Sequence, residues 1–240
     1  MGPRRPANVH RYPPGVKMQA KSISRRDFIK AAGIVLGGTA LVGSGLTVLD
    51  APQPVVTYPE YTFGEENMSK RILVTYASQA GSTAGVAEAI GKSLAEGGAQ
   101  VDVLPMKNVK DLTPYQAVVA GSAIHGQQWL PEAMQFMRDH QSELSRKPFA
   151  SFMVCITLSM ANANQYLEGV KGWMNPVREL VRPVSEGYFA GVLDFSRLPF
   201  SFNVLAMRIA VLTGVWKEGD HRDWKAIRAW AESTRPLLFK

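Results

Sequence analysis

Residues 72–83 read ILVTYASQAGST, a mostly apolar run of six residues followed directly by six small or polar ones. A short apolar run bounded by polar residues predicts a buried β-strand over 72–77. The apolar residues of 83–96 recur at helical spacing, and Gly97 with Gly98 forms a helix stop, so a helix follows the strand. A strand that turns through a glycine into a helix is the opening unit of an α/β domain.

The same alternation of strand and helix patterns continues toward the end of the chain. The predicted strands are 100–104, 117–121, 149–158 and 184–193, and the predicted helices are 131–144, 163–181 (interrupted near Pro176) and 223–233. Continuously apolar strands that alternate with helices indicate a parallel sheet covered on both faces. We therefore expect an α/β fold, a doubly wound five-stranded parallel sheet with strand order 2-1-3-4-5.

The first fifty residues have the pattern of a targeting segment. Residues 1–22 are basic and proline-rich, which predicts a disordered tail. The pair Arg25 and Arg26 then precedes an uncharged apolar stretch over 31–49, a pattern that resembles a twin-arginine signal. Residues 23–50 are assigned to this signal, which predicts export across the cytoplasmic membrane.

The fate of the apolar stretch stays open at this point. It is long enough to span the hydrocarbon core of a bilayer. The protein is therefore expected either in the periplasm after cleavage or anchored to the outer face of the membrane through 31–49. The proline-rich residues 51–68 are predicted to form a linker, and residues 69–240 to form the folded domain.

Composition restricts the function further. The net charge of the 240 residues is +7, but eight lysines and arginines precede residue 31, so the basic excess belongs largely to the tail and we expect no nucleic-acid binding. One cysteine and four histidines show no metal-ligand spacing, and no metal site is expected. Cys155 lies inside an apolar run, which favours a buried structural side chain over a redox thiol.

Ligands of a doubly wound sheet bind beyond the carboxyl ends of its strands, where the strand order reverses. This rule selects the loops after the first, third and fourth strands. The first loop contains Ser78, Gln79, Ala80, Gly81, Ser82 and Thr83, and neither the Walker nor the dinucleotide pattern. Its hydroxyls and the N–H groups at the helix start form a cradle for a phosphate without a charged side chain. The alternative, an N-cap, accounts for only one of the hydroxyls.

The segment 72–83 resembles the phosphate loop of flavodoxins, with Ala80 where a hydroxyl is commoner. The resemblance covers residues 70–240 and implies a flavodoxin-like fold that binds FMN. Within that superfamily, the sequence GSAIHG at 121–126 and the aromatic-rich region after Gly191 are most similar to the menaquinone-dependent protoporphyrinogen dehydrogenases.

The resemblance also implies where the flavin lies, with its phosphate on the first loop and its ring between the other two. These loops comprise Ser122, Ala123, Ile124, His125, Gly126 and Gln127, and then Leu158, Ser159, Met160, Ala161 and Asn162. Trp129 is expected either to stack on the ring or to belong to the core, and His125 either to approach the ring or to be an exposed loop residue. The flavin carries the redox chemistry, so no catalytic side chain is required.

The segment 195–216 is apolar and rich in aromatic residues. It is interpreted either as a hydrophobic platform for a quinone or a membrane surface, or as a helix packed on the sheet.

Together these expectations describe an FMN-binding redox protein, exported by the twin-arginine route, that exchanges electrons with a quinone or a protein partner. Twin-arginine export carries folded proteins, which suits a cofactor acquired before export. The first alternative is a menaquinone-dependent protoporphyrinogen IX dehydrogenase, although that oxidation is expected on the cytoplasmic side. The second alternative is a flavodoxin-fold binding module without FMN.

Overall fold

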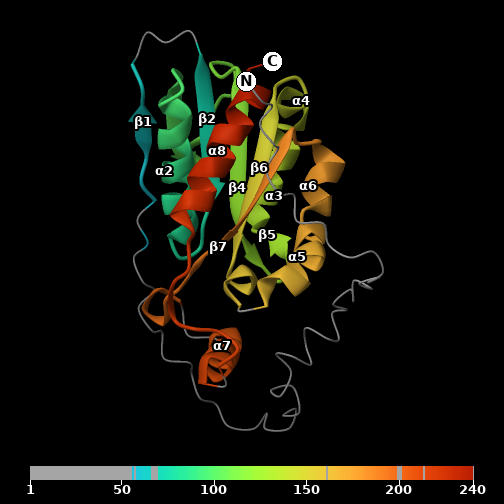
Figure 1. Cartoon of the computed structure of the whole chain (residues 1–240). Helices are drawn as coiled ribbons and strands as arrows, with labels where there is room; N and C mark the ends of the chain where they lie inside the picture. The colour runs from blue at the N-terminus through green and yellow to red at the C-terminus, as the bar shows by residue number, and fades with distance from the viewer. Residues whose placement is uncertain are drawn as a thin grey trace, which may run out of the picture.

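The computed structural model describes residues 56, 58–65, 70–160, 162–198, 202–212 and 214–239. The predicted tail and the predicted twin-arginine signal lie outside these residues. Five parallel strands form the centre of the main sheet (Figure 1), in the order β3 (Gln100–Pro105), β2 (Arg71–Ala77), β4 (Ala117–His125), β6 (Phe149–Cys155) and β7 (Ser185–Ala190). In chain order this is 2-1-3-4-5, so the predicted doubly wound topology is confirmed.

Helices cover both faces of this sheet (Figure 1). On one face lie α2 (Ser82–Ala95) and α8 (Trp224–Leu238); on the other lie α3 (Pro131–Asp139), α4 (Gln141–Leu144), α5 (Ala163–Gly172) and α6 (Asn175–Leu180). Successive residues of a strand point to opposite faces of the sheet. Ile72 and Val74 pack in the core beneath α2 and α8, whereas Leu73 packs in the core on the opposite face. The two cores explain why the strands read as continuous apolar runs.

Two helices are broken where the sequence predicts longer ones. The break between α5 and α6 falls just before Pro176, as expected, because proline lacks an N–H donor and suits the start of a helix. The predicted helix 131–144 is also interrupted, at His140, which separates α3 from α4. The last helix is longer than predicted and continues to Leu238.

An additional strand lies at the edge of the sheet. The strand β1 (Tyr61–Phe63) pairs antiparallel with β3, so these residues, which were predicted to be linker, belong to the domain. The hydroxyl of Thr62 donates a hydrogen bond of 2.8 Å to Asp102 Oδ1. Aromatic residues and threonine favour strands, but three residues between Pro59 and Gly64 are too few for a periodic pattern.

The chain leaves the sheet between β7 and α8 and forms a separate unit, the C-terminal excursion. It contains β8 (Val192–Leu193), a 3-10 turn η3 (Phe195–Arg197), α7 (Phe202–Leu212) and β9 (Gly219–Asp220), and β8 pairs antiparallel with β9. Figure 1 shows α7 beyond the carboxyl ends of the strands, so it does not pack on a face of the sheet as one interpretation of 195–216 held. Instead Met207 and Val211 pack on Leu193 and Phe195. No helix in the described part of the chain is long and apolar enough to cross a membrane.

Cys155 is buried at the end of β6, and burial raises the pKa of its thiol to about 12. At pH 8 only about one thiol in ten thousand is then ionised, and the thiolate is the reactive form. We therefore expect the native protein not to react with a thiol reagent such as DTNB, and the urea-unfolded protein to react with one equivalent. Rapid stoichiometric labelling of the native protein would contradict the buried position of Cys155.

Candidate functional site

The loop after β2 folds back on itself at the start of α2. Gly81 is the N-cap of α2 and has a φ of 85°, a left-handed conformation that favours glycine. Its N–H donates a hydrogen bond of 3.0 Å to the Oγ of Ser78, which is buried. Gln79 is exposed, and Ala80 and Ser82 are half-buried. The residues predicted to hold a phosphate thus form one compact turn.

Thr83 has an unusual environment in this turn. Its side chain is 0% exposed, and its Oγ1 has no hydrogen-bond partner among the described residues. A buried hydroxyl without a partner costs about 1–3 kcal/mol. In the first turn of α2 the N–H of Ala84 donates to the Gly81 carbonyl at 3.2 Å, the N–H groups before it lack partners within the helix, and no acidic residue is present. This set of donors without acceptors fits the phosphate of a flavin nucleotide.

A pocket of about 400 Å³ opens beside the turn. It is lined by Val56, Pro59, Gly81, Ala84, Gly85, Arg197 and Arg222. The Oη of Tyr76, at the end of β2, donates a hydrogen bond of 2.7 Å to the carbonyl of Pro59 and so ties this wall to the sheet. Burial raises the pKa of Tyr76, which keeps the phenol protonated as a donor.

Two arginines of the C-terminal excursion reach this pocket. Arg222 Nη1 donates a hydrogen bond of 3.3 Å to the carbonyl of Ser82, and its guanidinium lies 4.3 Å from the ring centroid of Trp224. Arg197 also lines the pocket, with its Nε 3.1 Å from Asp194 Oδ2. The loop 78–83 itself contains only uncharged donors, as predicted. Two cationic side chains that were not predicted, Arg197 and Arg222, also line the pocket beside it.

No local sequence pattern points to these arginines. Arg197 and Arg222 follow Gly81 by 116 and 141 positions, and the pairing of β8 with β9 together with the packing of α8 on α2 brings them to the same place. The one indication in the sequence is Asp223 at the N-cap of the last helix, because the residues before it must lie at the carboxyl ends of the strands.

The second predicted loop is largely a strand. The strand β4 continues to His125 and turns through Gly126 and Gln127, with φ of 59° and 67°, into β5 (Gln128–Trp129). Ser122 is buried, and its Oγ donates to the Ala123 carbonyl and accepts from the Leu130 N–H.

Its position corrects the prediction that Ser122 contacts a ligand, because its hydrogen bonds are used within the protein. Ala123 and Ile124 are half-buried strand residues, and His125 and Gly126 form the exposed tip. The tip therefore presents an exposed histidine at the carboxyl end of β4.

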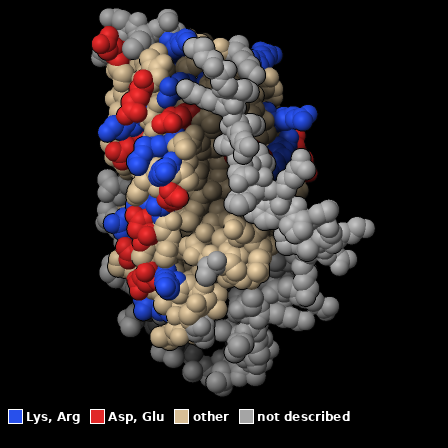
Figure 2. Space-filling view, viewed as in Figure 1, with Lys and Arg blue, Asp and Glu red and all other residues tan. Residues whose placement is uncertain are grey.

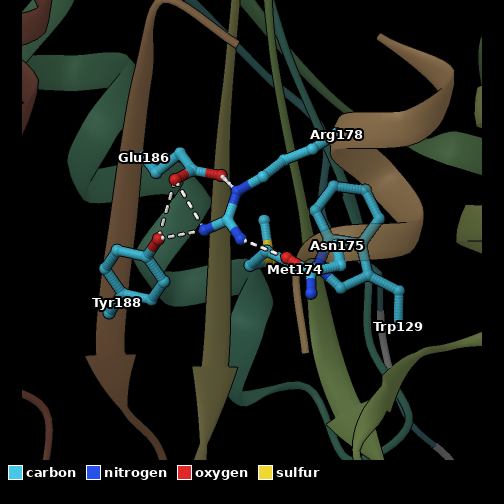
Figure 3. A network of polar contacts seen from close by, with 6 residues as sticks. All are labelled: Trp129, Met174, Asn175, Arg178, Glu186 and Tyr188. Atoms are coloured by element: carbon cyan, nitrogen blue, oxygen red, sulfur yellow. Dashed lines mark hydrogen bonds and ion pairs between the residues drawn. The ribbon is translucent and has the colours of Figure 1, made fainter. Parts of the chain in front are cut away.

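Trp129 is a core residue. Its side chain is 3% exposed, and its Nε1 donates a hydrogen bond of 3.1 Å to Met174 Sδ. Figure 3 shows the indole against Met174, next to the network in which Arg178 joins Asn175, Glu186 and Tyr188. Of the two interpretations of Trp129, the structure supports the core position, in which the indole is buried and bonded to Met174.

The third predicted loop begins as the 3-10 turn η2 (Ile156–Ser159). Leu158, Ser159 and Met160 are half-buried, and Ser159 Oγ donates a hydrogen bond of 2.7 Å to the Ile156 carbonyl. Ala161 lies outside the described residues. Asn162 is exposed at the start of α5, and its Nδ2 donates to Tyr166 Oη at 3.3 Å. Because β2, β4 and β6 are parallel neighbours, all three predicted loops emerge at the same end of the sheet.

The charged side chains are mixed rather than segregated on one side of the molecule. In Figure 2, lysines and arginines alternate with aspartates and glutamates over the side that carries α2 and α8. The described residues visible there form no continuous basic strip of the kind that holds a nucleic-acid backbone.

A family model described as a flavodoxin domain matches residues 73–214, which is more than half of the chain. The chain belongs to the flavodoxin family. Its α/β fold, with the sheet order described above, agrees with this membership. The matched residues include Arg197 and end before Arg222.

The individual proteins matched are less than 30% identical to this chain in sequence. A protein of Leishmania major named protoporphyrinogen IX dehydrogenase [quinone] is 29% identical over 180 residues, a match that covers 71% of this chain and 77% of the relative. A solved flavodoxin from the domain Archaea is 17% identical, with a TM-score of 0.43, and the match covers 71% of this chain and 99% of that one. A short-chain flavodoxin associated with a non-canonical PDU bacterial microcompartment is 14% identical, with a TM-score of 0.45, covering 71% and 97%.

Proposed function

We propose that this flavodoxin-family chain binds FMN through residues 78–83 and acts as a redox protein. The observation that carries the proposal is Thr83 Oγ1, a buried hydroxyl at the start of α2 without a partner among the described residues. Phosphate oxygens accept hydrogen bonds from such a hydroxyl and from the N–H groups of a first helical turn. When FMN is bound, its ring supplies the electron-transfer chemistry.

The residues of this chain hold and orient the cofactor in the proposal. Gly81 and Ser78 set the shape of the turn, and Thr83 donates to the phosphate. The accessible residues at the ends of β4 and β6, namely the His125–Gly126 tip and Leu158, Ser159, Met160 and Asn162 of the third loop, are assigned to the ring. This assignment follows the rule that ligands bind where the strand order of the sheet reverses.

The proposed electron partner is a quinone such as menaquinone, or a redox protein. Ile209, Leu212 and Val215 are exposed, Leu212 to 86%, which gives the C-terminal excursion apolar side chains for such a partner or a membrane. The test is anaerobic mixing of the FMN-loaded protein, reduced with dithionite, with a soluble menaquinone analogue. Rapid reoxidation of the flavin supports a quinone partner, and no reoxidation on mixing would exclude it.

A second candidate is oxidation of protoporphyrinogen IX with a quinone as acceptor. The name of the Leishmania major relative supports it. Quinone reduction by the FMN-loaded protein that depends on added protoporphyrinogen IX supports this activity. Quinone reduction that needs an added reductant, and that protoporphyrinogen IX cannot drive, rules it out. A colourless protein that does not take up FMN leaves only a binding module of the same fold.

Export by the twin-arginine route is part of the proposal and rests on residues outside the described part of the chain. Replacing Arg25 and Arg26 by lysines preserves charge but removes the paired guanidinium groups that define the pattern. We expect the double variant to remain in the cytoplasm while the unaltered protein reaches the periplasm or the outer face of the membrane. Cell fractionation measures the outcome, and unchanged export would contradict the assignment of 23–50.

A further inference from the structure

We propose that Arg197 and Arg222 clamp the phosphate-binding turn from outside, with Arg197 binding the ligand phosphate and Arg222 holding the turn in position. This inference rests on the proposed function, because it assigns two residues to the same phosphate. Neither residue belongs to the loop 78–83, and both come from the C-terminal excursion.

The position of Arg197 supports its assignment to the ligand phosphate. A Cβ placed on Gly81 would lie 3.7 Å from Arg197 Nη1, so the guanidinium approaches the N-cap of α2 closely. Its ion pair with Asp194 is closest at Nε, 3.1 Å from Oδ2, while Nη1 is the atom that lies toward Gly81. Hydrogen bonding from Ser196 and the charge of Arg197 lower the pKa of Asp194, so this carboxylate stays ionised and holds the guanidinium at neutral pH.

The contacts of Arg222 support its role in holding the turn in position. Its Nε and Nη2 form a bidentate pair with Asp220, at 2.9 and 2.6 Å, and its Nη1 donates to the Ser82 carbonyl. A Cβ on Gly85 would lie 2.6 Å from Nη1, so the glycine is what allows the guanidinium to lie on the first turn of α2. The Arg222 side chain is only 17% exposed, which fits a positioning role.

Charge favours an anionic ligand beside the clamp. The N-terminus of a helix carries partial positive charge, so cations placed there are unfavourable on their own. Two arginines nevertheless line the pocket at the start of α2; each is paired with an aspartate, Asp194 or Asp220, but no acidic residue occupies the first turn of the helix. A phosphate monoester carries a charge of about −1.5 to −2 at pH 7. It therefore complements the helix end and the arginines at once, and arginine suits it because its N–H groups form two parallel bonds.

The experiment compares FMN with riboflavin, which has the same ring and lacks the phosphate. Dissociation constants are measured by quenching of flavin fluorescence with the full chain freed of flavin. We expect Arg197→Gln to weaken FMN binding about tenfold, the effect of one charge-assisted hydrogen bond, with riboflavin binding unchanged. The salt dependence of FMN affinity should also become shallower, since one partly exposed charge is lost.

The control is Arg146→Gln, which removes the same charge at an exposed position before β6, at the opposite end of the sheet. It should leave both dissociation constants unchanged. An unchanged ratio of FMN to riboflavin affinity in Arg197→Gln, or an equal loss for both flavins, would overturn the assignment of Arg197. If the unaltered protein binds no FMN, the proposed function itself fails, which is a different result.

The positioning role of Arg222 has its own test in Gly85→Ala. Alanine favours a helix more than glycine does, which offsets the loss of the Arg222 hydrogen bond to Ser82, so the variant should fold. Its Cβ must displace Arg222, and we expect FMN affinity to fall several-fold while riboflavin affinity does not change. Full FMN affinity in this variant would overturn the positioning role.

Discussion

The Thr83→Val protein will bind FMN about 10–100-fold more weakly than the parent. Valine has nearly the shape of threonine, so it fills the same buried space at the start of α2 but cannot donate to a phosphate. A hydrogen bond to a charged group contributes about 1.5–3 kcal/mol, which corresponds to the expected loss. The dissociation constant from a fluorescence titration of the flavin-free protein measures it.

The same substitution will not destabilise the flavin-free protein. It removes a buried hydroxyl that has no hydrogen-bond partner among the described residues, and such a group costs about 1–3 kcal/mol. Ser151→Ala is the matched control, because Ser151 Oγ in β6 is also buried without a described partner but lies away from the turn. The control should gain stability without changing FMN affinity. Parental FMN affinity in Thr83→Val would contradict the role of the hydroxyl.

Phe152→Ala is expected to lower the free energy of unfolding by about 3–5 kcal/mol. The ring is 0% exposed in the α2–α8 core, with its centroid 6.3 Å from those of both Phe189 and Trp230. It also fills the space over Gly121, where an added Cβ would lie 2.1 Å from the ring. Truncation therefore leaves a cavity that neighbouring backbone cannot close.

Urea unfolding of the flavin-free protein measures this loss, since bound ligand would add its own stabilisation. Phe152→Leu, which removes less volume, is expected to cost about 1.5 kcal/mol or less and covers the case in which the alanine variant does not fold. A loss below about 1 kcal/mol for Phe152→Ala would be inconsistent with a fully buried ring.

The sheet was predictable from the sequence because its strands obey a local rule. Runs such as 72–77 and 149–155 are apolar on both faces and separated by helical patterns, which permits few topologies. The turn 78–83 was predictable for the same reason, since it directly joins a strand to a helix. Both features depend only on residues that are neighbours in the chain.

The features that the sequence did not reveal depend on contacts between distant residues or on single dihedral angles. The hairpin at His125 requires a positive φ at Gln127, which is not a glycine and gives no turn pattern. Trp129 could not be assigned to the core without its partner Met174, which lies 45 positions later. The arginines at the turn are placed by the pairing of β8 with β9, two strands of two residues each.

The flavin content of the purified protein tests the central claim most directly. The full chain is expressed in cells supplied with riboflavin, and the pigment released by denaturation is identified and counted. We predict a yellow protein that releases one FMN per chain and, once stripped, takes FMN up again with higher affinity than riboflavin. A well-folded protein that is colourless and does not take up added FMN would contradict the claim that the turn at the start of α2 holds a flavin phosphate.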